Sequence, residues 1–259
     1  MTEYVLTEKS GGVLTLTLNR PEKKNALTRA MYQALGDAID GAADDKEVRC
    51  VLIQANGDMF TAGNDLADFA AVNAGDPEAK QAQIDGNPLL KALGRAKTPL
   101  VAAVQGRAVG VGVTMLLHCD LVFVAEDALL TTPFVNLALL PEAASSILLP
   151  ARIGHVRAFS MFVLGEAIDG RKAEAWGIAN VALPADQVRA RARAAAEVVA
   201  SRPPASVAIT KALMRDPATL AARMEEEGQH FISQLKSAEA KEAFAAFAEK
   251  RAPDFSTVA

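Results

Sequence analysis

The feature that most constrains the fold is the stretch from Gln105 to Glu142, which sets three glycines between apolar runs. In AVQGRAVGVGVTMLLHCDLVF a buried strand leads through Gly106, Gly110 and Gly112 into an apolar helix and a second strand. The stretch closes with LLPEAASS, in which Glu142 is a single carboxylate among hydrophobic residues. Glycine lets the backbone approach a ligand, and the first N–H groups of a helix are unpaired. The turn at Gly110 is therefore a candidate for presenting a backbone N–H to a carbonyl oxygen beside Glu142.

Segments on the N-terminal side place this stretch in an α/β core. Val13–Leu18 alternates leucine with threonine, the period-two pattern of a half-buried strand, and Cys50–Ala55 is a continuous apolar run typical of a strand covered on both faces. Between them, Thr28 is a good N-cap for a helix with apolar residues at helical spacing. Leu100–Val104 is another buried strand. Strand, helix and buried strand in this order predict an α/β fold.

The chain changes character beyond Leu183. Helices without an intervening strand are predicted at 186–200, 206–214 and 218–250. We therefore expect an α/β core with the binding site over residues 1–195 and a helical C-terminal region over residues 196–259. The last predicted helix is charged but carries an apolar stripe, which predicts docking on the core or on another subunit, and closure of the site. The stripe consists of Leu220, Met224, Phe231, Leu235, Phe244 and Phe247.

Charge and cysteine usage exclude several kinds of partner. The net charge is −4 with Lys and Arg scattered along the chain, so neither nucleic acid nor a membrane is an expected partner. Cys50 and Cys119 sit in apolar runs without zinc-like spacing, which predicts buried thiols and no metal site. No secretory leader and no apolar run of about 18 residues is visible, so a cytoplasmic protein is expected.

A second glycine turn, Phe60–Asp65 (FTAGND), follows the strand at Cys50–Ala55. In α/β sheets ligands gather where such turns lie, at the strand ends. Two N–H groups converging on one oxygen form an oxyanion hole, in which one donor is worth about 3 kcal/mol of barrier. Taken singly, each turn is more typical of an ordinary strand-to-helix connection, because Gly, Asn and Asp are common turn residues. The turn at Gly110 also lacks the spacing of a dinucleotide-binding fingerprint.

The motifs together resemble a known family. FTAGNDL, then AAVQGRAVGVGVTMLLHCDLVFVAEDALLTTPF, then LLPEAASS look like the enoyl-CoA hydratase/isomerase (crotonase) superfamily. The resemblance begins at RPEKKNAL and runs through the helical C-terminus. It implies the crotonase fold, a spiral of ββα units with a helical C-terminal region, and an acyl-CoA substrate. It also implies a homotrimer or a dimer of trimers, and no cofactor, since coenzyme A is part of the substrate.

Matching positions carry the family's catalytic roles onto this chain. The resemblance implies that the backbone N–H groups of Asn64 and Val111 form the oxyanion hole. Family hydratases have one glutamate where this chain has Thr114, and a second where it has Phe134. Glu142 instead stands where hydratases have glycine, which resembles the Δ3,Δ2-enoyl-CoA isomerases, whose single catalytic glutamate lies at this position.

This pattern predicts isomerisation of 3-enoyl-CoA to 2-enoyl-CoA in fatty acid metabolism. A 1,3 shift of a double bond needs one base, whereas hydration commonly needs two carboxylates to hold and polarise water. Hydrophobic neighbours would desolvate Glu142 and raise its pKa. Read from the sequence alone, Glu142 is equally compatible with a solvated acid in the first turn of a helix.

Other activities remain as alternatives. One is an enoyl-CoA hydratase, a lyase, or another crotonase activity, and the other is a non-catalytic homologue that binds acyl-CoA or a protein. Asp65 is expected to cap the following helix or to tie its loop together rather than to act as a base. His118 is expected to lie in the core, and Lys211 to be solvated or to meet CoA phosphates. Contacts to the acyl-CoA are expected from position at Lys24, Ala26, Ala62, Asn64, Leu66, Gly110 and Phe134.

Overall fold

The computed structural model describes residues 2–65 and 86–258, and its centre is a six-stranded sheet. The strands lie in the order β1-β2-β3-β4-β6-β9; β1 and β2 are antiparallel, and every later neighbour is parallel. Their bounds are Val5–Ser10, Val13–Leu18, Cys50–Ala55, Leu100–Val104, Leu121–Ala125 and Val181–Leu183. The predicted α/β class is confirmed.

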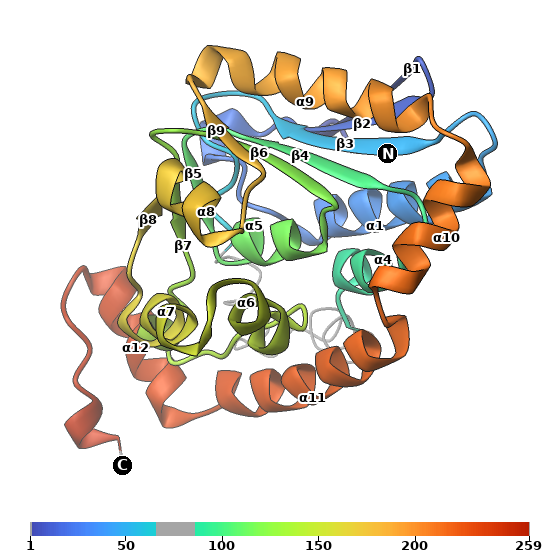
Figure 1. Ribbon diagram of the computed structural model, residues 1–259. Helices are drawn as coiled ribbons and strands as arrows, with labels where there is room; N and C mark the ends of the chain where they lie inside the picture. The colour runs from blue at the N-terminus through green and yellow to red at the C-terminus, as the bar shows by residue number, and fades with distance from the viewer. Residues whose placement is uncertain (1, 66–85, 259) are drawn as a thin grey trace.

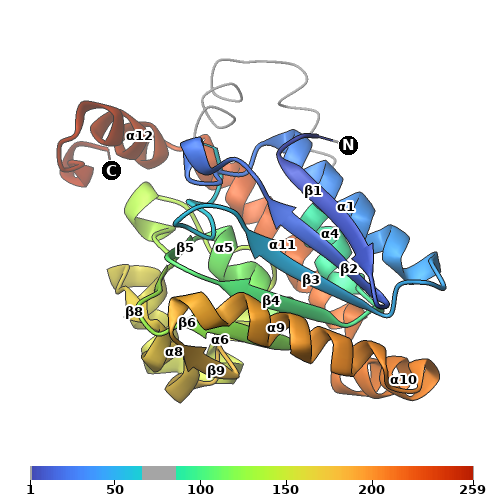
Figure 2. The ribbon, with the colours of Figure 1, turned by 90° about the horizontal axis from the view of Figure 1, so that it is seen from above.

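Helices cover both faces of this sheet (Figures 1 and 2). Helix α9 (Ala185–Ala200) lies along one face, against β3, β4 and β6. The other face carries α1 (Arg29–Asp44), α4 (Pro88–Arg95) and α5 (Val111–Thr114). Parallel strands buried on both sides read as continuous apolar runs, which is why Cys50–Ala55 was recognisable as such a strand.

The prediction that Val13–Leu18 is half-buried is wrong. Thr15 and Thr17, expected to face solvent, are only 6% and 8% exposed. Arg193 of α9 donates to Oγ1 of Thr15 at 3.3 Å, and Gln54 donates to Oγ1 of Thr17 at 3.1 Å. The polar side chains of this strand are therefore paired beneath a helix rather than hydrated.

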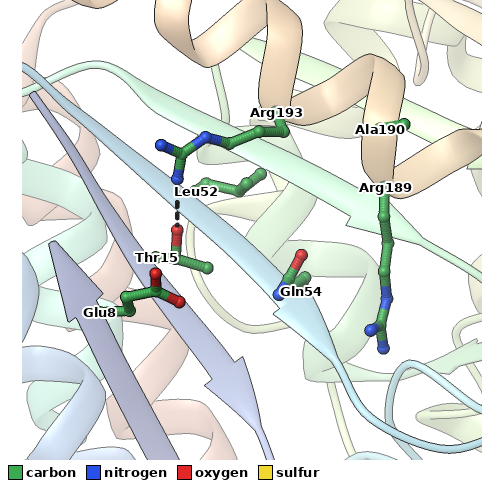
Figure 3. A pocket seen from close by; sticks show the side chains of 7 residues that line it. All are labelled: Glu8, Thr15, Leu52, Gln54, Arg189, Ala190 and Arg193. Atoms are coloured by element: carbon green, nitrogen blue, oxygen red, sulfur yellow. Dashed lines mark hydrogen bonds between the residues drawn. The ribbon is translucent and has the colours of Figure 1, made fainter. Parts of the chain in front are cut away.

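A shallow pocket lies between α9 and strands β1 to β3 (Figure 3). Arg189 and Arg193 reach down from the helix, and Glu8, Thr15 and Gln54 come from the strands. This pocket is on the α9 face of the sheet, whereas α5 and α6 are on the other side (Figure 1).

A small second sheet lies beside the glycine turn. It consists of β5 (Arg107–Val109), β7 (Leu129–Thr131) and β8 (Ile168–Asp169), with β5 parallel to β7 and β7 antiparallel to β8. The amide of Gly110 donates to the carbonyl of Thr131, the last residue of β7, at 2.9 Å. This bond joins the second sheet to the glycine turn.

The helix start predicted at Thr28 is confirmed. The side chain of Thr28 accepts from Met31 N in α1, Pro88 opens α4, and Asp169 accepts from Lys172 N at the start of α8. The helical remainder comprises α6 (Ser145–Ile153), α7 (His155–Phe159) with a π-helical turn Ser160–Leu164, α8 (Gly170–Trp176), α10 (Pro204–Met214), α11 (Pro217–Leu235) and α12 (Ala238–Glu249). Short 3-10 turns lie at Pro21–Lys23, Met115–His118, Val135–Leu137 and Phe255–Thr257.

One continuous helix predicted over 218–250 is wrong in detail. The first helix ends at Leu235, with Lys236 as its C-cap, and Ser237 caps a new helix by accepting from Ala240 N. Helix α11 runs below α6 in the view of Figure 1, and α12 projects at one side of the molecule in both views (Figures 1 and 2). Leu220 and Leu235 of the apolar stripe are buried, while Phe247 is 57% exposed.

In the part of the chain that the structure describes, no helix is long and apolar enough to span a membrane. The same residues contain no group of three or more His, Cys, Asp or Glu side chains that could hold a metal ion. Cys50 and Cys119 are free and buried as predicted, and burial raises the pKa of both thiols to about 12.

Candidate active site

The two glycine turns are joined to each other by a short parallel bridge. Thr61 N donates to Arg107 O and Val109 N donates to Thr61 O, each at 3.1 Å, across the bridge between Thr61 and Ala108. The contact is close at Gly112, where an added Cβ would lie 2.5 Å from Cγ2 of Thr61. The turn that carries Asn64 and the turn that carries Val111 are thus held side by side.

The backbone N–H of Asn64 points away from the bridge that holds its turn. In that parallel bridge Leu27 bonds to the two neighbours of Asn64: Leu27 N donates to Gly63 O at 2.8 Å, and Asp65 N donates to Leu27 O at 3.0 Å. The Asn64 side chain accepts a hydrogen bond from the hydroxyl of Tyr32 in α1. These contacts fix the residue while leaving its amide outside the ladder.

The backbone N–H of Val111 is the first of a helix. Gly110, with φ 56° and ψ −114°, is the N-cap of α5, and its carbonyl accepts from Val113 N and Thr114 N. Val111 N lies at N1, where a helix amide has no intrahelical acceptor. Among the described residues, neither Val111 N nor Asn64 N donates a hydrogen bond to a backbone acceptor. Both amides can therefore donate to a ligand oxygen.

Glu142 reaches the same short helix from the segment before α6. Its Oε1 accepts a hydrogen bond of 2.5 Å from the hydroxyl of Thr114, three residues after Val111. Burial raises the pKa of Glu142 to about 7; the Thr114 hydroxyl opposes this shift, and the negative charge of Glu227 adds to it. A carboxyl group with this pKa can take up and release a proton near neutral pH.

Glu142 is not part of a helix. Ala143 and Ala144, which follow it, have φ of 62° and 55°, and α6 begins only at Ser145. The interpretation of Glu142 as a solvated acid in a first helical turn is therefore wrong, because left-handed residues separate it from the helix.

Backbone around Lys24, Ala26 and Ala62 gathers beside the Asn64 turn. Ala62 N donates to Lys24 O at 2.9 Å, and Arg20 bridges Ala26 O at 3.0 Å and the Asp65 carboxylate at 2.6 Å. The prediction that Asp65 ties its loop is confirmed by this ion pair. The Lys24 ammonium is exposed and pairs with Asp58 at 2.8 Å.

The remaining predicted contacts are spread over the glycine turn and its neighbours. Phe134 is 6% exposed and packs on Phe162 with 6.1 Å between ring centroids. Its ring lies 3.8 Å from where a Cβ on Gly110 would be, so Phe134 borders the glycine turn. Leu66 falls outside the described residues.

Lys211 has a different role from either of those expected. It is 7% exposed and its ammonium donates to Asp120 Oδ2 at 2.7 Å and to Thr98 O at 2.9 Å. This fastens α10 to the start of β4 and leaves no solvated cation for a phosphate. The prediction failed because a lysine on a helix gives no sequence signal of a buried partner so far away along the chain.

The comparison with known proteins decides the family. The model of the enoyl-CoA hydratase/isomerase family matches residues 8–257. The chain belongs to this family. The family acts on acyl-CoA substrates, so this is a crotonase-type acyl-CoA enzyme.

Individual members are similar over most or nearly all of the chain, and a solved structure of the family confirms the predicted crotonase-type fold. A crystal structure of an enoyl-CoA hydratase/isomerase from Pseudoalteromonas atlantica T6c is 44% identical, with a TM-score of 0.90 over 98% of this chain and 100% of that one. The 1,2-epoxyphenylacetyl-CoA isomerase of Escherichia coli K12 is 30% identical over 98% of this chain and 99% of its own length. The enoyl-CoA delta isomerase 2 of Rattus norvegicus is 35% identical over 82% of this chain, which spans only 54% of that protein.

No role was predicted from the sequence for Glu227 or Arg215, and for His118 only a place in the core was predicted. His118 is fully buried as expected, yet both of its ring nitrogens are hydrogen-bonded. Glu227 is 7% exposed and contacts the segment that carries Glu142. A signal for Glu227 was present, because it falls on the same helical face as Leu220 and Phe231, where a charge is unexpected.

Proposed function

We propose that the protein is a Δ3,Δ2-enoyl-CoA isomerase that uses one carboxylate and two backbone amides. The observation that carries this proposal is the bond between Thr114 and Glu142. Thr114 occupies the place of one hydratase glutamate, and Phe134, an apolar residue, occupies the place of the other. With neither hydratase glutamate present, Glu142, whose pKa is raised to about 7, is the acid/base group that the described residues supply at this site.

In the proposed reaction, the thioester carbonyl of a 3-enoyl-CoA accepts hydrogen bonds from Asn64 N and Val111 N. The Glu142 carboxylate removes a proton from C2, and the electron pair moves onto the thioester oxygen to give a dienolate. Glu142 then returns the proton to C4, which yields the 2-enoyl-CoA. One base suffices because the dienolate is held between the two proton transfers.

Lys24, Ala26, Ala62, Gly110 and Phe134 are proposed to line the acyl-CoA site. Ala62 and Asn64 belong to one turn, and Lys24 and Ala26 lie on the loop bonded to it. A homotrimer or dimer of trimers, a cytoplasmic location and a role in fatty acid metabolism stay predictions.

The test offers the purified protein 3-enoyl-CoA and 2-enoyl-CoA separately in heavy water. The expected result is conversion of the 3-enoyl-CoA with deuterium incorporation, lost in Glu142→Gln while CoA binding persists. Addition of water to 2-enoyl-CoA at a comparable rate would instead assign a hydratase. Binding of acyl-CoA with neither conversion would favour the non-catalytic alternative.

A further inference from the structure

The peptide group that joins Ala143 to Ala144 is held from both sides by distant side chains. Its carbonyl oxygen lies 2.7 Å from Nε2 of His118, and its N–H donates to Oε2 of Glu227 at 2.6 Å. Glu227 belongs to α11 and lies 83 residues beyond Ala144. Because this peptide group lies one residue beyond Glu142, its orientation constrains how the backbone presents the Glu142 side chain.

This part of the backbone needs external support. Ala143 and Ala144 both have positive φ, a conformation that residues with a Cβ rarely adopt. Ala144 is also the N-cap of α6 and has no side-chain oxygen to offer the helix amides. The Glu227 carboxylate supplies what is missing, since its Oε1 also accepts from Ser146 N at 3.0 Å.

His118 is fixed in one protonation state. Arg215 Nη2 lies 2.7 Å from Nδ1 of His118, and a guanidinium can only donate, so Nδ1 accepts and Nε2 carries the proton donated to Ala143 O. Burial, followed by the charge of Arg215, lowers the pKa of His118 to about 3. The histidine is thus neutral near pH 7, and this contact does not titrate there.

We propose that Glu227 is a positioning residue for proton transfer at Glu142: it locks the Ala143–Ala144 peptide group so that the Glu142 carboxylate stays against Thr114. This inference rests on the proposed function, in which Glu142 moves the proton. It gives α11 a specific task in the chemistry, although Glu227 itself touches neither the substrate nor the oxyanion amides.

Charge provides a second link between the two glutamates. Burial is the main cause of the raised pKa of Glu142, and the negative charge of Glu227 raises it further. Within the described residues, the other group acting on Glu142 is the Thr114 hydroxyl. Burial raises the pKa of Glu227, while its bonds to Ser146 and Ala144 and the charge of Arg223 oppose the shift.

Two substitutions separate geometry from charge. Glu227→Gln keeps the length of the side chain but removes its charge, and its NH2 group cannot accept from the second of the two amides. We therefore expect kcat to fall by about tenfold or more, with KM within about twofold. The acid limb of its pH profile should move to lower pH. Glu227→Asp keeps the charge but cannot reach both amides, so kcat should fall while the acid limb stays in place. Glu225→Gln, an exposed change of the same kind on the same helix, is the matched control.

A titration that needs no substrate distinguishes this inference from the proposed function. Glutamate labelled with carbon-13 at the carboxyl group gives an NMR signal for Glu142, assigned by its loss in Glu142→Gln. The midpoint of that signal should fall in Glu227→Gln and stay unchanged in Glu225→Gln. If the midpoint falls but no isomerisation is found, the proposed function fails and the coupling stands. Folded Glu227→Gln with unchanged midpoint and kcat would overturn the inference; should that variant not fold, an unchanged kcat in Glu227→Asp would do so.

Discussion

The hydroxyl of Thr114 donates a 2.5 Å hydrogen bond to Glu142, 28 residues further along the chain. Thr114 ends the short helix that Val111 begins, so this bond fastens the carboxylate to the element that carries one candidate oxyanion amide. The bond also favours the ionised form of Glu142 and limits the rise in pKa that burial causes. The same contact therefore sets both the place and the basicity of the proposed base.

Replacing Thr114 with valine should make Glu142 harder to ionise. A hydrogen bond to a charged group is worth about 1.5–3 kcal/mol, and about 1.4 kcal/mol corresponds to one pKa unit. The acid limb of kcat/KM for 3-enoyl-CoA should therefore move up by about one pH unit in Thr114→Val. Thr114→Ser retains the hydroxyl and should keep the wild-type profile. An unshifted limb in the valine variant would show that this bond does not tune the base.

Glu142 should make the folded protein less stable as pH rises. Its pKa is raised from 4.5 to about 7 in the folded state, so the folded chain holds the proton more tightly than the unfolded chain. The resulting stability is fully present below the unfolded pKa and is lost as pH rises through the folded one. Glu142→Gln should therefore be more stable than wild type at about pH 8, by at most about 3 kcal/mol, and nearly equal to it at about pH 4. Urea unfolding at both pH values measures the difference, and a constant difference would contradict the raised pKa.

Gly112→Ala should disturb the contact between the two glycine turns that carry Asn64 and Val111. The new Cβ would lie 2.5 Å from Cγ2 of Thr61, and crowding of this kind typically costs about 1–3 kcal/mol. We expect kcat to fall by about tenfold or more because the Val111 amide moves relative to Asn64. The measurement is kcat for 3-enoyl-CoA at saturation.

The double variant Thr61→Ser with Gly112→Ala supplies the control. Serine lacks the methyl group that the new Cβ would meet but keeps the hydroxyl that donates to Asn25 O at 2.6 Å and accepts from Gly63 N at 3.0 Å. Much of the lost kcat should therefore return. If the double variant is as slow as Gly112→Ala alone, the defect does not arise from this contact.

Local patterns predicted the elements that position the site but not the contacts between them. The strands at Cys50–Ala55 and Leu100–Val104 could be recognised because burial on both faces leaves a continuous apolar run. The N-cap at Thr28 could be recognised because the capping oxygen lies within a few residues of its partner. The exposure of Thr15 was mispredicted because the helix above it comes from a part of the chain about 180 residues away.

The candidate site shows the same limit. The turns at Asn64 and Gly110 were evident from glycine spacing, and Glu142 from its apolar neighbours. Their meeting depends on the bridge at Thr61, which pairs residues 47 positions apart, and no local pattern encodes it. The left-handed Ala143 and Ala144 were unpredictable for a different reason: alanine does not favour that conformation, and the partners that impose it are His118 and Glu227.

The ion pair of Lys211 with Asp120 should contribute strongly to stability. Burial lowers the pKa of Lys211, and the contact with Asp120 compensates, so the ammonium depends on its partner. Lys211→Met keeps much of the apolar stem but leaves the Asp120 carboxylate, whose side chain is 30% exposed, without its cation. Breaking a buried pair by removing one partner costs about 3–5 kcal/mol, and partial solvation of Asp120 reduces the expected loss to about 2–3 kcal/mol.

Lys9→Met is the matched control, because Lys9 pairs with Asp45 at the surface, where both side chains keep access to water. Surface ion pairs contribute little to stability, since solvent already stabilises both charges. Urea unfolding at neutral pH should therefore show a clear loss for Lys211→Met and no measurable loss for Lys9→Met. Equal effects of the two substitutions would mean that the buried ammonium does not hold α10 on the sheet, and Lys211 would again be a candidate for binding phosphate.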